Sequence, residues 1–194
     1  MTTLVLADDS RLIVRSMAAE RFAATTEVSE RFFNEHADAI SRACHAMAGQ
    51  FQRGGRLFVC GDGAQRSDVA HVVVEFVHPV VVGKRALPAI ALPDISSGAA
   101  RRMLEVMGRR GDLVMLLTAG APTGAELAVL ASARERAMLA IALTGPSDAA
   151  GGSADYLFVV PSSDPYIVQE THEMLYHVLW ELVHLFFDHR TSAP

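Results

Sequence analysis

Five short apolar segments alternate with helical patterns from residue 56 onward. The apolar segments are RLFVC (56–60), LPAIAL (87–92), DLVMLLT (112–118), MLAIALT (138–144) and YLFVV (156–160). They are apolar throughout, which is typical of strands covered on both faces of a parallel sheet. Residues 67–77, 99–110 and 124–136 carry apolar positions at helical spacing, whereas 145–155 is rich in turn residues. This alternation predicts a doubly wound α/β fold with a five-stranded parallel sheet.

Helical patterns also flank the predicted sheet. Residues 27–52 have helical spacing and stop before two glycines, a C-terminal signal, and a shorter helix is expected around 10–24. After the sheet, a long helix is expected to begin near Pro165. Its apolar residues run nearly all the way round, which predicts a buried helix, in the core or between subunits. The first few residues and the tail TSAP are expected to be mobile.

Composition and charge narrow the class of protein. The chain has 194 residues, of which 51% are hydrophobic and 20% charged, as expected for one globular domain over 1–194, with a helical region at about 10–53 and an α/β sandwich at about 56–190. The net charge is −5 with no basic stripe, which argues against nucleic acid as a partner. We see no signal peptide and no apolar run near 20 residues, so no membrane span is expected. Two cysteines, Cys44 and Cys60, indicate buried thiols in a cytoplasmic protein.

Two glycine-rich loops follow predicted strands and lead into predicted helices. They are VCGDGAQRSD after the first strand and TAGAPTGAEL after the third. Ligands of open α/β folds bind at the carboxyl edge of the sheet, and a helix N-terminus there can hold an anion with its backbone N–H groups. Phosphate binding is one interpretation of both loops. The first loop could instead be a tight turn, and Thr123 in the second could cap the following helix.

Polar residues on two predicted helices could form a site. His71 and Glu75 stand four apart among valines in SDVAHVVVEFVH, and therefore share one helical face. The final helix offers Gln169, His172, Glu173, His177 and His184. A histidine in such a helix is commonly a satisfied core residue or an interface partner. Together with His71 and Glu75, however, an amide and a second imidazole complete a plausible set of nitrogen and oxygen ligands for a divalent ion such as zinc.

These segments, taken in order, resemble the phosphoheptose isomerases of the SIS (sugar isomerase) fold. The likeness covers about residues 30–187 and rests on GDGAQRSDVAHVVVEF, LPAIAL, a TAG loop, LTG and VQETHEMLYHVLWEL. It implies a zinc site built from His71, Glu75, Gln169 and His177. It also implies isomerisation of the phosphorylated sugar sedoheptulose 7-phosphate, with Glu75 and His177 as the proton-transfer pair, in a homotetramer whose sites lie between subunits. The expected substrate contacts are Asp62, Gly63, Asp94, Thr118, Gly120, Thr123 and Gln169.

The chain departs from the family pattern where the phosphate is held. The family's GNGGS loop is Gly61-Asp62-Gly63-Ala64-Gln65, and its STSGNS loop has lost most of its hydroxyls in residues 117–123. A family loop between Asp94 and Gly111 is shortened. Two other hypotheses therefore stay open: a non-catalytic SIS module that binds a phosphosugar or a protein partner, and a polar cluster that only stabilises a tetramer interface.

Overall fold

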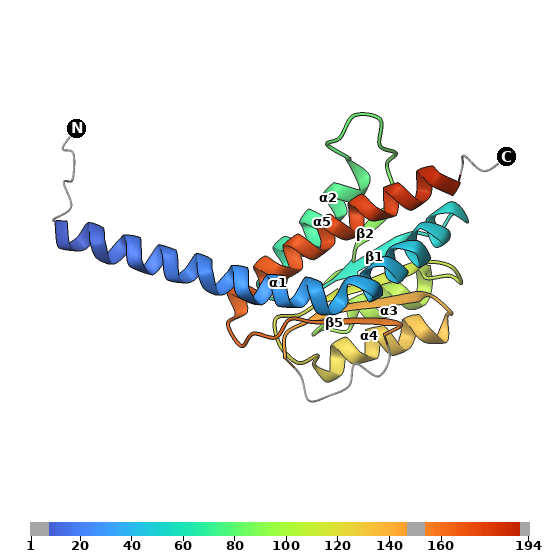
Figure 1. Cartoon of the computed structure of the whole chain (residues 1–194). Helices are drawn as coiled ribbons and strands as arrows, with labels where there is room; N and C mark the ends of the chain where they lie inside the picture. The colour runs from blue at the N-terminus through green and yellow to red at the C-terminus, as the bar shows by residue number, and fades with distance from the viewer. Residues whose placement is uncertain (1–7, 147–153, 191–194) are drawn as a thin grey trace, which may run out of the picture.

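The computed structural model describes residues 8–146 and 154–190, and it contains one parallel sheet between two layers of helices (Figure 1). The strands are β1 (Leu57–Cys60), β2 (Ala89–Ala91), β3 (Leu113–Leu117), β4 (Leu139–Thr144) and β5 (Tyr156–Val159). Their spatial order is β2-β1-β3-β4-β5, and every neighbouring pair is parallel. The predicted five-stranded, doubly wound parallel sheet is confirmed, and its strand order is that of flavodoxin-like folds.

The helices are α1 (Asp8–Gln52), α2 (Gln65–Val77), α3 (Ala99–Met107), α4 (Gly124–Glu135) and α5 (Pro165–Arg190). Successive strand residues face opposite sides of the sheet and enter two separate cores. On β3, Met115 packs in the core that α1, α2 and α5 share, whereas Val114 and Leu116 pack against α3 and α4. This two-sided burial explains why the strands are apolar at every position.

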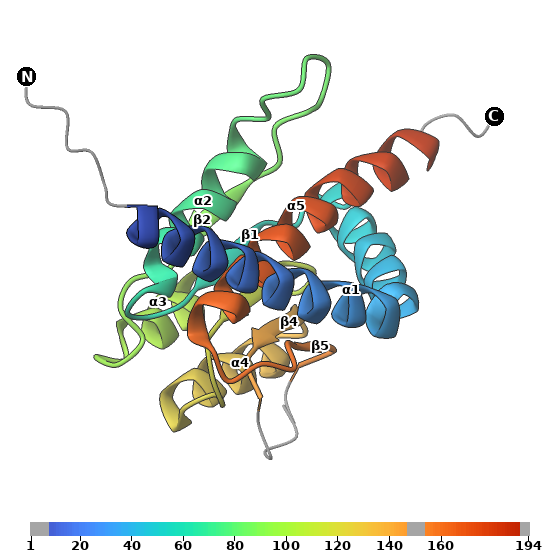
Figure 2. The same ribbon diagram turned by 60° about the vertical axis from the view of Figure 1, so that its left-hand side comes forward.

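One continuous helix replaces the two helices expected at 10–24 and 27–52. That prediction was wrong because residues 8–48 contain neither glycine nor proline, so nothing at residues 25–26 interrupts the backbone hydrogen bonds. The hydroxyl of Thr26 donates a hydrogen bond to the carbonyl oxygen of Phe22 one turn earlier (2.8 Å). A helix accommodates a threonine in its interior through this kind of hydrogen bond. The first part of α1 extends away from the sheet, and its later part lies against α5 (Figures 1 and 2).

The last helix, α5, buries one side against the sheet and α1. Val168, Leu175, Leu179 and Val183 are fully buried, whereas Met174 and Leu185 are 36% and 43% exposed. The expected burial is thus confirmed for that side of the helix. The two segments predicted to be mobile fall largely on residues 1–7 and 191–194, which lie outside the described residues. Among the described helices, none has the length and apolar character that crossing a membrane requires.

Candidate active site

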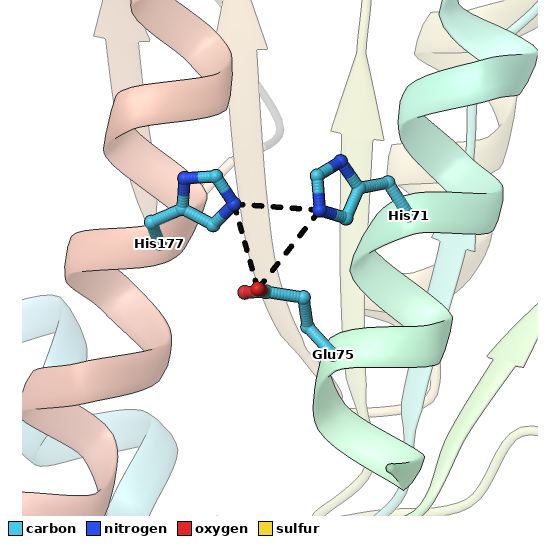
Figure 3. A group of neighbouring side chains, drawn as sticks. All are labelled: His71, Glu75 and His177. Atoms are coloured by element: carbon cyan, nitrogen blue, oxygen red, sulfur yellow. Dashed lines mark hydrogen bonds and ion pairs between the residues drawn. The ribbon is translucent and has the colours of Figure 1, made fainter. Parts of the chain in front are cut away.

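Helices α2 and α5 lie side by side and bring three predicted site residues together. His71 and Glu75 come from α2 and His177 from α5, and their side chains point toward one another (Figure 3). Nε2 of His71 lies 3.4 Å from Nε2 of His177. Glu75 Oε1 lies 3.9 Å from the first of these nitrogens and 3.5 Å from the second. Residues more than a hundred positions apart in sequence therefore converge on one point.

This trio has the chemistry of a metal site. One ligand atom from each residue lies within 4.8 Å of the other two. The second carboxylate oxygen, Glu75 Oε2, is buried and has no hydrogen-bond partner in the described structure. A buried carboxylate oxygen without a donor is unfavourable unless a cation or proton satisfies it. Two imidazoles and one carboxylate are ligands typical of Zn²⁺, so the residues present fit such an ion.

Gln169, the fourth predicted ligand, is held by Asp68. Its amide nitrogen donates to both carboxylate oxygens of Asp68, at 3.2 and 3.0 Å. Asp68 is buried, which raises the pKa of its carboxyl, while the hydrogen bond from Gln169 opposes that rise. Because the nitrogen is engaged, the amide oxygen is the Gln169 atom left to bind a cation. Its role as a ligand stays a prediction.

Tyr176 is a neighbour of the trio that the sequence patterns did not indicate. It is 1% exposed, and its hydroxyl oxygen lies 3.0 Å from Nδ1 of His71. Burial raises the pKa of the phenol, and the nearby carboxylate of Glu173 raises it further. Tyr176 directly precedes His177, and the sequence pattern around it predicts only an aromatic residue of the core. Only its proximity to His71 on the other helix distinguishes it.

Two further histidines of α5, His172 and His184, conform to the core interpretation. His172 is fully buried, with Nε2 3.3 Å from the carbonyl oxygen of Thr144, and burial lowers its pKa to about 4. His184 is 1% exposed, and its two ring nitrogens lie near the carbonyl oxygens of Trp180 and Arg85. Both rings lie apart from the trio and stabilise the packing around α5.

Two of the predicted substrate contacts, both acids, have structural partners in the strand-end loops. Asp62 accepts hydrogen bonds from the backbone N–H groups of Ile95 and Ser96, both at 3.0 Å, and so ties the loop after β1 to the loop after β2. Asp94 accepts from the backbone N–H of Ser97 and from the Ser96 hydroxyl, and these bonds lower the pKa of Asp94. The two acids therefore shape the edge of the sheet, and substrate contact by either stays a prediction.

The loop after β3 shows how the second predicted anion loop is built. Thr123 caps α4: its hydroxyl accepts from the N–H of Glu126 (3.3 Å), and the Glu126 carboxylate accepts from the N–H of Thr123 (2.6 Å). Such a cap contributes about 1 kcal/mol, and the capping role expected as one alternative for Thr123 is confirmed. Thr118 is buried, with its N–H donating to the carbonyl oxygen of Leu143 (3.0 Å).

The glycines predicted to contact substrate lie in open surroundings. Gly63 adopts a left-handed backbone with φ of 59°. A side chain added at Gly63 or at Gly120 would meet nothing within 4 Å. The backbone at both positions is therefore accessible to a ligand, although contact with substrate stays a prediction for each.

Two cavities bear on the location of a ligand. A cavity of about 580 Å³ lies between α1 and α5 and reaches His177; its lining includes Arg21, Phe22 and Met174. A second cavity, of about 510 Å³, lies at the opposite edge of the sheet and is lined by Arg53, Arg56, Arg109 and Arg110, among others. Arginines 53, 109 and 110 follow the ends of α1 and α3, where helix carbonyls attract positive charge, so the second cavity needs no ligand to explain its charge.

Comparison with known proteins identifies the family of the chain. The SIS domain family matches residues 20–145. A phosphoheptose isomerase from Roseiflexus sp. is 31% identical over 176 residues, covering 82% of this chain and 88% of that protein. One from Chlorobium phaeobacteroides is 30% identical over 203 residues, covering 95% and 89%.

A solved structure shows the same fold. The phosphoheptose isomerase structure from Francisella tularensis superposes with a TM-score of 0.79 at 23% identity, covering 89% of this chain and 98% of that one. At this identity the likeness establishes the fold alone, and the sequence relatives establish the family. This chain therefore belongs to the phosphoheptose isomerase family and is an isomerase built on a SIS domain.

Proposed function

We propose that this protein interconverts sedoheptulose 7-phosphate and D-glycero-D-manno-heptose 7-phosphate and that it binds zinc at His71, Glu75, Gln169 and His177. The convergence of the two imidazoles and Glu75 across α2 and α5 carries the proposal. The unpartnered Glu75 Oε2 and the amide orientation of Gln169 support the same ligand set. The names of the relatives support the substrate.

The reaction moves a proton between neighbouring carbons through an enediol. The Glu75 carboxylate removes a proton from C1 of the ketose and returns it to C2, while His177 transfers a proton between the two substrate oxygens. Their ligand-bearing atoms lie 3.5 Å apart, so both can reach one small group. Bound zinc would supply positive charge near the two oxygens and stabilise the charge that develops there. Because a metal-bound carboxylate is a weaker base, Glu75 would have to be released from a bound ion to act as the base, so its two roles would alternate.

We also propose that the active assembly is a homotetramer with its sites between subunits. The projecting part of α1 supports this, since Leu12, Met17 and Phe22 are 64%, 64% and 75% exposed. Phe22 also lines the cavity that reaches His177, so a second chain covering this part of α1 would close the site. Light scattering should give the mass of four chains, and a monomer at micromolar concentration would exclude the assembly.

The cytoplasmic location stays a prediction.

A coupled assay with sedoheptulose 7-phosphate and added zinc tests the reaction. We expect turnover that a chelator abolishes and zinc restores. Phosphosugars that raise the unfolding temperature without being converted would contradict the reaction and favour a binding module. Turnover that survives complete zinc removal would contradict the metal site alone.

A further inference from the structure

The two ring nitrogens of His71 have different surroundings. Nε2 faces His177 and Glu75, at 3.4 and 3.9 Å, and is the nitrogen that can bind a cation there. Nδ1 faces the Tyr176 hydroxyl oxygen at 3.0 Å and Glu173 Oε1 at 3.6 Å. A neutral imidazole carries its proton on one nitrogen only, and a ligating nitrogen must be the unprotonated one. The tautomer of His71 therefore decides whether the site is ready for a metal.

Both neighbours of Nδ1 are oxygen atoms that can accept a hydrogen bond. A carboxylate has no proton to donate at neutral pH, so Glu173 disfavours a lone pair on Nδ1 and favours an N–H there. The phenol oxygen of Tyr176 can accept the same N–H, which leaves the phenol's own proton to orient in the field of the Glu173, Asp68 and Glu75 carboxylates, whose negative charges act on the phenol. The alternative tautomer would place a lone pair on Nδ1 beside the Glu173 carboxylate.

Tyr176 is also held rigidly. It is buried, and its ring packs edge-on against both imidazoles, with centroids 5.3 Å from His71 and 5.0 Å from His177. A side chain locked by packing holds its hydroxyl at a fixed point. By contrast, the Glu173 side chain is 47% exposed, and its carboxylate lies farther from Nδ1, at 3.6 Å. Tyr176 is thus the nearer and more deeply buried of the two partners of Nδ1.

We propose that Tyr176 is a positioning residue that holds His71 as the Nδ1–H tautomer, so that the lone pair of Nε2 points at His177 and Glu75. Its relevance to zinc rests on the proposed function, whereas the tautomer is a property of the metal-free protein. Outer partners of this kind orient a ligating histidine, and their loss typically weakens metal binding 10–100-fold.

The first test reads the tautomer without any metal. Long-range ¹H–¹⁵N spectra of metal-free protein are recorded near pH 8.5, above the ordinary pKa of histidine of about 6.5, with the His71 signals assigned by their loss in His71→Ala. We expect Nδ1–H in the wild type and a gain of the Nε2–H form in Tyr176→Phe, which keeps the ring and removes only the oxygen. A wild-type His71 in the Nε2–H form would overturn the inference, whatever the protein does with zinc.

The second test measures zinc affinity by competition with a chromophoric chelator. Tyr176→Phe should bind zinc about 10–100-fold more weakly than the wild type, with an unchanged unfolding transition. The matched control is Tyr166→Phe, which removes the same atom from a 69% exposed ring on the same helix and should change neither reading. Equal zinc affinity in Tyr176→Phe and wild type would overturn the inference. Wild-type protein that shows the Nδ1–H form but takes up no zinc would contradict the proposed function and leave the tautomer assignment standing.

Discussion

Replacing His71 or His177 by alanine should abolish stoichiometric zinc binding. Wild-type protein purified without chelators is expected to carry about one zinc ion per chain, because the two imidazoles and Glu75 meet within 4.8 Å. Each substitution removes a ligand outright, so affinity should fall by more than the 10–100-fold that follows loss of an outer partner. Zinc content after gel filtration, measured by atomic emission, reads the result directly.

The same substitutions should leave the fold intact. The side chains of His71 and His177 are 40% and 42% exposed, so their truncation opens little buried space. Zinc at a hundred times its dissociation constant should stabilise the wild type by about 2.7 kcal/mol and neither variant. His78→Ala, which truncates an exposed histidine just beyond α2, is the matched control and should retain the metal. Full zinc content in His71→Ala or His177→Ala would refute the ligand assignment.

Glu75→Gln should lower kcat about 10²–10⁴-fold, the range by which a positioned general base accelerates proton transfer. The amide keeps the size of the side chain and cannot accept a proton from carbon. The side chain is 19% exposed and faces both imidazoles, so the change acts at the centre of the site. The kcat values are compared at zinc concentrations that saturate each protein. A lower kcat then reports the loss of the general base and not weaker metal binding.

Hydrogen exchange separates proton removal from the later steps. In D₂O the wild type should incorporate deuterium at C1 of the ketose, which NMR detects, and Glu75→Gln should not. Glu181→Gln serves as the control, because it makes the same change at an exposed carboxylate one turn beyond His177 on α5. A Glu75→Gln rate within a few-fold of the wild type would show that another group removes the proton.

Much of the architecture follows from local patterns. Apolar runs bounded by turn residues located all five strands to within two residues of their ends. A strand buried on both faces is apolar at every position, so it stands out in the sequence as an uninterrupted apolar run. Pro165 marked the first residue of α5. The pattern failed at α1, where two helices were expected, at 10–24 and 27–52, and the absence of any helix-breaking residue produced one. Helix continuity depends on backbone hydrogen bonding, which hydrophobic periodicity does not report.

The site residues likewise fall into those that local spacing indicated and those that only the tertiary structure revealed. Spacing alone placed His71 and Glu75 on one face of α2, because residues four apart are neighbours on a helix. Spacing did not select His177 over His172 or His184 on α5, whereas the resemblance to the family did. Packing explains the difference between these histidines, because His172 and His184 lie on the buried side of the helix against backbone carbonyls. The parts played by Tyr176 beside His71 and by Asp68 beside Gln169 emerged only from the contact between α2 and α5. By itself the sequence determined the elements and the kinds of ligand available, because those depend on neighbours along the chain; which atoms meet was decided by tertiary packing, because it joins residues a hundred positions apart.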